Sequence, residues 1–299
     1  MKAGLLGYPI AHSLSPTIHQ AAYEALGLDW EYGLYPCEDR AAFARALAEA
    51  QADPAGFVGF NVTTPYKVDA YKACATHTRF SAAVGNANVI TFSPRRNDPS
   101  DQPLLVGDST DGRGLVASLE RDGGVAVAGS SVVLCGTGPV ALSVLLSLID
   151  AQVASVSVLS RDPHAAREQL RSLCERLTPE RAEALPLPKL SLATYGEAAT
   201  CLEAADILID ATPVGMNPTD APVVAPEALK AGLVVLDTVY GHGETALLRA
   251  ARAVGAVAID GLGMLIEQAA LTIEIWARTQ GCPVEAPRAL MRHAALNKR

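Results

Sequence analysis

The sequence predicts an α/β protein of two domains, each built around a largely parallel sheet. Short apolar runs alternate with segments of helical period along the whole chain, which is typical of successive βαβ units. A buried strand enters a glycine-rich turn and then an apolar helix at residues 131–149. The length of 299 residues also exceeds the roughly 150 residues of one average domain.

We expect strands at residues 3–6, 31–35, 56–61, 88–92, 131–135, 155–159, 206–210, 234–237 and 256–259. We expect helices at residues 16–26, 41–50, 140–149, 163–177, 245–254 and 265–279. The strands are short apolar runs, whereas the helices repeat apolar residues at intervals of three and four. Residues 93–101 are polar and rich in proline, which predicts a hairpin turn.

A glycine-rich stretch at residues 111–123 precedes a new strong strand and suggests a domain boundary. We therefore expect one domain at residues 1–110 and a second at residues 111–263. The last helices follow the strand that should complete the second sheet. We expect residues 264–299 to return to the first domain and complete it.

Composition excludes several classes of protein. The 24 basic and 32 acidic residues give a net charge of −8, which disfavours binding to nucleic acid phosphates. No segment is apolar enough to span a membrane, and the first residues read as a core strand rather than a signal peptide. Six scattered cysteines and six histidines without ligand spacing predict a reduced cytoplasmic protein without a metal site. Monomer and homodimer both stay open.

The turn after the strand at residues 131–135 has the pattern Gly-x-Gly-x-x-Ala. Glycine lets the backbone approach a pyrophosphate, and the following helix N-terminus offers N–H groups to the anion. An ordinary strand–helix turn is the alternative, but the next strand follows at the spacing of a dinucleotide-binding fold. The residues that we expect at the phosphates are Gly136, Thr137, Gly138, Pro139 and Val140.

The strand at residues 155–159 should end near the adenosine ribose of such a dinucleotide, at Ser160, Arg161 and Asp162. An acidic residue there favours NAD, whereas arginine suits the additional phosphate of NADP. Asp162 before Pro163 is equally well explained as a helix N-cap.

Polar residues follow the first strand of the chain, at the start of a predicted helix. Ser15 is a natural N-cap and Pro16 a natural first helical residue. Ser13 adds a hydroxyl beside the same helix N-terminus, where anions are favoured. These residues predict a seat for a small carboxylate, although capping alone would explain Ser15.

Three more polar edges follow in the first domain. Asn61 and Thr63 alternate with apolar neighbours at a strand end, and Lys67 lies in the first turn of the next helix. A cation opposes the helix dipole at that position, which favours a functional role. Residues 85–89 and 107–112 place amides and carboxylates, among them Asn88 and Asp108, where open α/β sheets bind ligands. Each edge alone is more often a turn than a site.

These motifs together resemble the shikimate dehydrogenase family nearly end to end. The resemblance rests on Gly-x-Pro-Ile-x-His-Ser-x-Ser-Pro-x-x-His at residues 7–19, Asn-Val-Thr-x-Pro-x-Lys at 61–67 and Gly-Asp-x-Thr-Asp-Gly at 107–112. It continues in Ala-Thr-Pro-Val-Gly-Met at 211–216, Asp-Thr-Val-Tyr at 237–240 and Gly-Leu-Gly-Met-Leu-Ile-Glu-Gln-Ala at 261–269.

The resemblance implies a first domain that binds substrate and catalyses, and a Rossmann domain that binds the dinucleotide. It implies reversible reduction of 3-dehydroshikimate to shikimate by a nicotinamide cofactor, NADPH or NADH, within aromatic amino acid biosynthesis. Lys67 and Asp108 would be the catalytic pair. The expected substrate-binding residues are Ser13, Ser15, Asn61, Thr63, Lys67, Asn88, Asp108, Tyr240 and Gln268. The cofactor set would extend to Thr212, Pro213, Gly261 and Met264.

Some positions depart from the family pattern. Ser160-Arg161-Asp162 replaces Asn-Arg-Thr, and Ala165 lies near the place of a second basic residue, so NAD stays an alternative to NADP. Val89 and Ser109 replace a threonine and an asparagine near the ring, which leaves room for quinate. The alternatives are an NAD-preferring quinate/shikimate dehydrogenase and a cofactor-binding regulator without turnover, although Lys67 and Asp108 argue against the latter.

Overall fold

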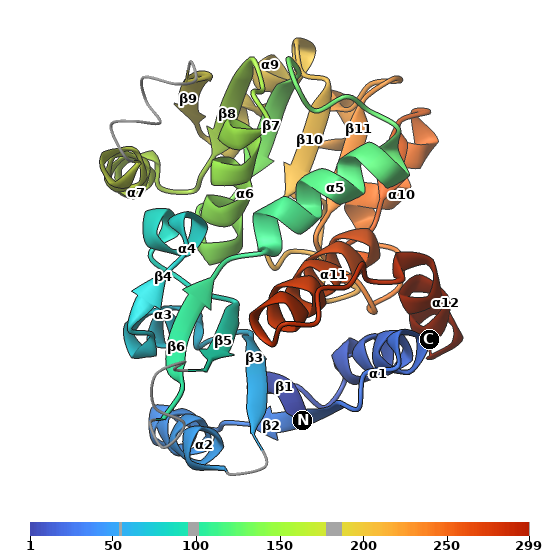
Figure 1. The fold of residues 1–299 in the computed structure, drawn as a ribbon. Coiled ribbons are helices and arrows are strands. Elements are labelled where there is room, and N and C mark those ends of the chain that lie inside the picture. Colours follow the sequence, from blue (N-terminus) through green and yellow to red (C-terminus); the bar gives the residue numbers. More distant parts are fainter. Residues whose placement is uncertain (54–55, 95–101, 178–186, 299) are drawn as a thin grey trace. The chain divides into compact units, whose positions relative to one another are not determined.

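The computed structural model describes residues 1–53, 56–94, 102–177 and 187–298. The chain divides into two compact units (Figure 1). One contains Met1–Thr110 and Ile266–Arg299, and the other contains Asp111–Leu265. Both are α/β units, which confirms the expected fold class.

The first unit holds a sheet of six strands in the order β2-β1-β3-β5-β6-β4. Its elements are β1 (Lys2–Gly7), α1 (Ser15–Leu26), β2 (Glu31–Pro36), α2 (Arg40–Ala52), β3 (Phe57–Val62), α3 (Lys67–Ala73), β4 (Thr76–His77), α4 (Arg79–Val84), β5 (Val89–Ser93) and β6 (Leu104–Asp108). The strand pairs β1–β2, β1–β3 and β4–β6 are parallel. Only β5 runs against its neighbours β3 and β6, so the sheet is mostly parallel, as predicted.

Side chains alternate along β3, so its two faces contact different residues. Phe60 points into an apolar cluster with Phe92 and with Leu47 of α2. Gly59 lies on the opposite face, where an added Cβ would overlap the Ile90 carbonyl and the indole of Trp276. Because side chains alternate along a strand, Asn61 shares the face of Gly59. This face lies against α11 (Leu262–Thr279), the helix that carries Trp276.

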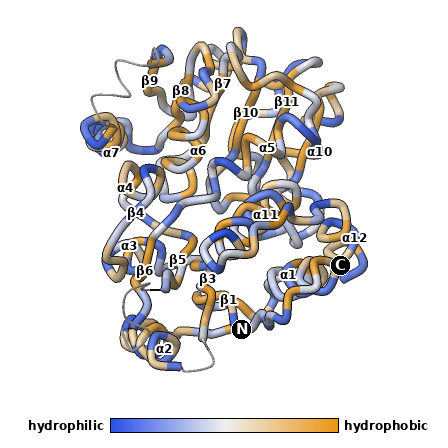
Figure 2. The backbone as a smooth tube through the Cα atoms, viewed as in Figure 1, coloured by the Kyte–Doolittle hydropathy of each residue, from blue (hydrophilic) through white to orange (hydrophobic). Residues whose placement is uncertain are grey.

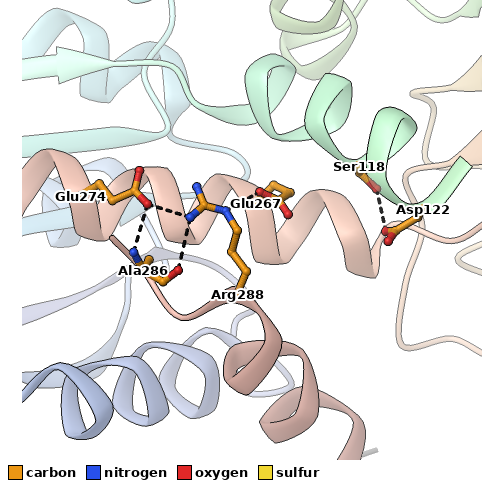
Figure 3. Close-up of polar contacts among 6 residues, drawn as sticks. All are labelled: Ser118, Asp122, Glu267, Glu274, Ala286 and Arg288. Carbon is orange, nitrogen blue, oxygen red and sulfur yellow. Dashed lines mark hydrogen bonds and ion pairs between the residues drawn. The ribbon is translucent and has the colours of Figure 1, made fainter. Parts of the chain in front are cut away.

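The C-terminal helices α11 and α12 (Arg288–Lys298) are joined by charged contacts (Figure 3). Arg288 Nε donates to Glu267 Oε2 at 2.7 Å, and a terminal nitrogen donates to Glu274 Oε1 at 2.8 Å. Glu267 is only 2% exposed, so its carboxylate depends on this partner. α12 also packs against α1, which fixes the end of the chain to the first unit.

The second unit holds six parallel strands in the order β12-β11-β10-β7-β8-β9. Its elements are α5 (Asp111–Gly123), β7 (Ser131–Cys135), α6 (Pro139–Asp150), β8 (Ser155–Leu159), α7 (Pro163–Arg176), β9 (Lys189–Ala193), η1 (Tyr195–Glu197), α9 (Ala198–Glu203), β10 (Ile207–Asp210), η2 (Pro226–Ala228), β11 (Val234–Asp237), α10 (Ala246–Ala253) and β12 (Val257–Ile259). This is the doubly wound order of dinucleotide-binding sheets, with its switch point between β7 and β10.

The central strands of this sheet are apolar along most of their length, whereas α7 carries hydrophilic residues (Figure 2). Fully buried residues such as Val133, Leu208 and Val235 supply one apolar core. Strands covered on both faces have no reason to alternate polar and apolar residues. This explains why the sequence shows them as continuous apolar runs.

Every strand expected from the sequence occurs, with its ends displaced by at most one residue. Three further strands, β4, β6 and β9, were not predicted. The stretch at residues 111–123, where a domain boundary was expected, forms the helix α5, and the N-terminal part of the first unit ends at Thr110 just before it. Gly112 is needed there because a Cβ would overlap the Ser143 carbonyl of α6. The predicted hairpin turn falls largely on residues 95–101, which lie outside the described residues.

Among the described residues, no helix is long and apolar enough to cross a membrane.

Candidate active site

Two backbone hydrogen bonds place Lys67 and Asp108 beside consecutive residues of the first unit, Ala87 and Asn88. The Lys67 carbonyl, at the start of α3, accepts from Ala87 N at 2.9 Å. The next residue, Asn88, donates its N–H to the Asp108 carbonyl at 3.1 Å. Lys67 therefore enters its helix beside the strand ends that carry Asn88 and Asp108.

The Asp108 carboxylate is fixed by two donors. Its Oδ1 accepts from Thr78 Oγ1 at 2.5 Å and from Ser109 N at 2.7 Å. The residue is 4% exposed, so these two hydrogen bonds hold the carboxylate oxygen in one orientation away from solvent. Asp108 thus presents one fixed carboxylate at the end of β6.

Asn88 belongs to a buried polar network with Thr110 and Gln268. Its Oδ1 accepts from Thr110 N at 2.7 Å, and its Nδ2 donates to Thr110 Oγ1 at 2.9 Å and to Gln268 Oε1 at 3.3 Å. Gln268 lies on α11 and is separated from Asn88 by 180 residues. The return of α11 to the first unit therefore unites two of the expected substrate ligands.

Asn61 and Thr63 end β3 within the same unit. Asn61 is 5% exposed, and its amide is bonded to Tyr32 and Thr272. Thr63 N donates to the Leu6 carbonyl at 2.9 Å, which fixes it beside β1. A Cβ at Gly7 would overlap the Thr63 methyl group, so the close approach of these strand ends requires glycine there.

The seat expected at Ser13 and Ser15 forms differently from the prediction. Helix α1 begins at Ser15 with Leu14 as its N-cap, and no side chain caps it. The prediction of Ser15 as the N-cap is therefore wrong. Ser13 Oγ instead accepts from Ser15 N at 3.2 Å, so Ser13 and not Ser15 binds an N–H at the start of the helix. The two serines still lie together at a helix N-terminus.

The phosphate turn of the second unit has the features that a dinucleotide needs. Gly136 has φ +100°, a left-handed conformation that side chains disfavour. Gly138 is the N-cap of α6 without any side-chain cap, and Pro139 follows at the first helical position. Within the described parts of the chain, and apart from the two neighbouring residues, no atom lies within 4 Å of a Cβ built on Gly138. The helix N-terminus is thus open to a pyrophosphate, and the residues present fit that group.

At the end of β8, Asp162 caps α7. Its Oδ1 accepts from His164 N and Ala165 N, both at 3.0 Å. Ser160 Oγ donates a hydrogen bond to the Asp162 carbonyl at 3.1 Å. Arg161 between them is exposed. The capping interpretation of Asp162 is therefore confirmed, whereas a contact with ribose stays a prediction.

Of the remaining expected residues, Thr212, Pro213 and Gly261 adjoin the carboxyl ends of β10 and β11, and Met264 lies in the first turn of α11. Thr212 N donates to Asp210 Oδ1 at 2.9 Å, and the Thr212 methyl lies 3.2 Å from where a Gly136 Cβ would stand. Thr212 and Pro213 thus adjoin the phosphate turn. Gly261 lies so close to Thr238 that a Cβ would overlap its carbonyl, and Met264 is 8% exposed.

Tyr240 and Gln268 fall in different units: Tyr240 is half-buried and follows β11 in the second, whereas Gln268 belongs to the first.

Several partners of the site were not expected from the sequence. Thr78 and Thr110 bind the side chains of Asp108 and Asn88, and Tyr32 and Thr272 bind that of Asn61. Thr110 lies within the motif at residues 107–112 and could have been found there. The other three have no motif, because their contacts join residues far apart in the chain.

Burial perturbs two carboxyl groups at the ends of β10 and β11. Desolvation raises the pKa of Asp210 to about 7, and the neighbouring carboxylate of Asp237 adds to the rise. Desolvation also raises the pKa of Asp237, although Thr245 and Val239 donate hydrogen bonds to its oxygens. No group of three or more metal-ligating side chains occurs in the part of the chain that the structure describes.

A doubly wound sheet with an open phosphate turn, joined in one chain to a unit that gathers Lys67, Asn88 and Asp108, defines a dinucleotide-dependent oxidoreductase. The family model for the shikimate dehydrogenase substrate binding domain matches residues 5–90. The shikimate dehydrogenase (NADP(+)) of Symbiobacterium thermophilum is 37% identical over 98% of this chain and 92% of its own length.

Two solved structures cover nearly the whole chain. Shikimate 5-dehydrogenase of Thermus thermophilus, in complex with NADP(H) and shikimate, has a TM-score of 0.81 and 26% identity, with 100% of both chains covered. Quinate dehydrogenase of Corynebacterium glutamicum, in complex with NAD, has a TM-score of 0.80 and 25% identity, with 99% of both chains covered. The chain belongs to the shikimate dehydrogenase family.

Proposed function

We propose that the protein is a shikimate dehydrogenase, which reversibly reduces the ketone of 3-dehydroshikimate to shikimate with NADPH. The observation that supports this most directly is the junction of Lys67, Asn88 and Asp108 in the first unit. The relatives named as NADP(+)-dependent shikimate dehydrogenases match nearly the entire chain. This function also gives a role to each polar strand end of the first unit.

The substrate would be held by groups of matching polarity. Ser13 and Ser15, at the N-terminus of α1, would bind its carboxylate, because a helix N-terminus favours an anion. Asn61, Thr63, Asn88, Gln268 and Tyr240 would bind its ring hydroxyls. The buried network of Asn88, Thr110 and Gln268 supports this, since rigid amides discriminate well between hydroxyl positions.

Lys67 and Asp108 would be the catalytic residues. The reduced nicotinamide supplies a hydride to the ketone carbon, and the ketone oxygen then requires a proton. Lys67 would donate that proton from its ammonium group as a general acid and accept it in the reverse direction. Asp108, with Oδ1 held by Thr78 and Ser109, would accept a hydrogen bond from a substrate hydroxyl and hold the ammonium in place.

The dinucleotide would bind the second unit at Gly136, Thr137, Gly138, Pro139 and Val140, with Thr212, Pro213, Gly261 and Met264 along its nicotinamide end. We favour NADP because Arg161 is exposed after β8 and suits the additional phosphate. One carboxylate oxygen of Asp162 is already engaged by the cap of α7. NAD remains the alternative.

A second candidate function is an NAD-preferring quinate/shikimate dehydrogenase. Ser109 and Val89 favour it, because both are buried beside Asp108 and Asn88 and replace larger or more polar residues of the family pattern. The quinate dehydrogenase of Corynebacterium glutamicum has a similar fold.

A four-way assay of kcat/KM, with shikimate and quinate and with NADP+ and NAD+, tests these proposals. We expect shikimate with NADP+ to give the highest value. A higher value for quinate with NAD+ would reverse the order of the two candidates. No turnover with any of the four combinations would support the third possibility, a regulator that binds the cofactor.

We further propose that the protein acts in the cytoplasm, as a monomer or a homodimer. Its six cysteines are all free, and three of them are buried, as expected of a protein kept in a reducing compartment.

A further inference from the structure

Both ends of the Asn61 amide are held by side chains that have no assigned function. The hydroxyl oxygen of Tyr32, on β2, lies 2.9 Å from Asn61 Oδ1. The hydroxyl oxygen of Thr272, on α11, lies 3.3 Å from Asn61 Nδ2. Thr272 is fully buried, and Tyr32 and Asn61 are less than a tenth exposed.

The direction of each hydrogen bond follows from counting protons. Thr272 has one hydroxyl proton and donates it to the Gln268 carbonyl at 2.8 Å. Toward Asn61 it can therefore only accept. The atom of Asn61 that faces it must be the amide nitrogen, so the amide oxygen faces Tyr32, whose hydroxyl must donate.

The Tyr32 ring is itself fixed. His19 stacks on it with centroids 4.0 Å apart and an interplanar angle of 22°. His19 is fully buried and also lies beside Tyr23 and Trp276. Burial lowers the pKa of His19 to about 3, so the ring is neutral at ordinary pH and packs as an aromatic group.

We propose that Tyr32 and Thr272 are positioning residues that orient the Asn61 amide so that its nitrogen, and not its oxygen, is offered to the substrate. This rests on the proposed function, in which Asn61 contacts a ring oxygen. An amide nitrogen has two protons, and Thr272 takes one of them. The second is a donor suited to a substrate oxygen, and neither positioning residue needs to touch the substrate.

Kinetics of conservative variants test the inference. Tyr32→Phe and Thr272→Val each remove one hydroxyl and keep the shape, so we expect KM for shikimate to rise about tenfold, as for one neutral hydrogen bond. The turnover number and KM for the dinucleotide should stay within about threefold of wild type. Thr272→Ser keeps the hydroxyl, so its KM for shikimate should equal that of the wild type. Tyr23→Phe removes a hydroxyl from the same aromatic cluster without a bond to Asn61, and should leave KM unchanged.

A double-variant cycle separates positioning from general loosening. In an Asn61→Ala background, Tyr32→Phe and Thr272→Val should produce no further rise in KM, because the group that they orient is gone. Unchanged KM values in the single variants, or an undiminished effect in the Asn61→Ala background, would overturn the inference.

The side-chain amide signals of Asn61 in ¹⁵N NMR spectra, assigned by their loss in Asn61→Asp, give a second test that needs no turnover. We expect slow solvent exchange in the wild type and at least about tenfold faster exchange in Thr272→Val. Equal exchange in both proteins would contradict the positioning role. Absence of shikimate turnover in the wild type would refute the proposed function alone, since the NMR result stands independently.

Discussion

The most unusual single residue is Asp210, a carboxyl group that is 1% exposed at the end of β10. Its Oδ1 accepts from Thr212 N, whereas its Oδ2 has no hydrogen-bond partner among the residues that the structure describes. Register places it opposite Asp237 of β11 and Cys135 of β7. Tyr195 also interacts electrostatically with Asp210. Burial and the neighbouring carboxylate of Asp237 favour the neutral acid and raise its pKa to about 7.

This raised pKa makes the stability of the protein depend on pH. Between pH 4 and pH 7, roughly, folded Asp210 holds a proton that the unfolded chain has lost, because its ordinary pKa is 3.8. The free energy of unfolding therefore falls as pH rises through this window and levels off above it. Asp210→Asn should remove the penalty and stabilise the protein at pH 8 by up to about 4 kcal/mol, at roughly 1.4 kcal/mol per pKa unit.

Urea denaturation at pH 4, 6 and 8 measures this effect. The gain from Asp210→Asn should be greatest at pH 8 and should vanish near pH 4. Glu203→Gln, an exposed carboxylate in the same unit, serves as the control and should change little at any pH. A gain that is equal at all three values would show that Asp210 does not titrate as described.

At the scale of elements, the phosphate turn joins β7 to α6 through two glycines with different tasks. Gly136 needs its positive φ, whereas Gly138 has φ −71° and ψ 179°, which any residue can adopt. Apart from its two chain neighbours, no residue that the structure describes lies within 4 Å of a Cβ at Gly138. Its lack of a side chain therefore has no structural explanation, and a ligand is the reason that remains.

Gly138→Ala should weaken dinucleotide binding without destabilising the fold. We expect the dissociation constant to rise about tenfold or more, equivalent to roughly 1.4 kcal/mol, because the methyl group would occupy the place of the pyrophosphate. The free energy of unfolding without ligand should change by less than about 0.5 kcal/mol. Gly196→Ala, whose Cβ would make only an ordinary contact 3.7 Å from Thr194 Oγ1, is the control for binding measured by fluorescence titration.

The attachment of α12 to α11 depends on one guanidinium. Arg288→Met would leave the buried carboxylate of Glu267 without that cation, and we expect a loss of about 3 kcal/mol in unfolding free energy. Arg171→Met, which removes exposed ion pairs on α7, should cost less than about 1 kcal/mol. Equal losses in urea denaturation would mean that the Arg288 contacts do not hold the helices together.

For the molecule as a whole, sequence reasoning reached the α/β class and the main strands because both leave periodic signals. Strands β4 and β9 are short or half-exposed, and β6 follows a proline-rich segment, so none produces a clear apolar run. The contacts of Thr78 with Asp108 and of Thr272 with Asn61 span 30 and 211 residues. They depend on the antiparallel β5 and on the return of α11, which no local pattern specifies. The motifs therefore indicated the candidate ligands but not the residues that orient them.

The account as a whole depends on Lys67 as the group that supplies the proton once hydride reaches the ketone carbon. Steady-state kcat of Lys67→Ala for shikimate oxidation, compared with that of Lys72→Ala on the same helix, tests this most directly. We expect Lys67→Ala to lower kcat by about two to four orders of magnitude, as for a lost general acid–base, with a much smaller change in KM. Lys72→Ala should behave as wild type. A kcat near the wild-type value in Lys67→Ala would remove that lysine from the mechanism.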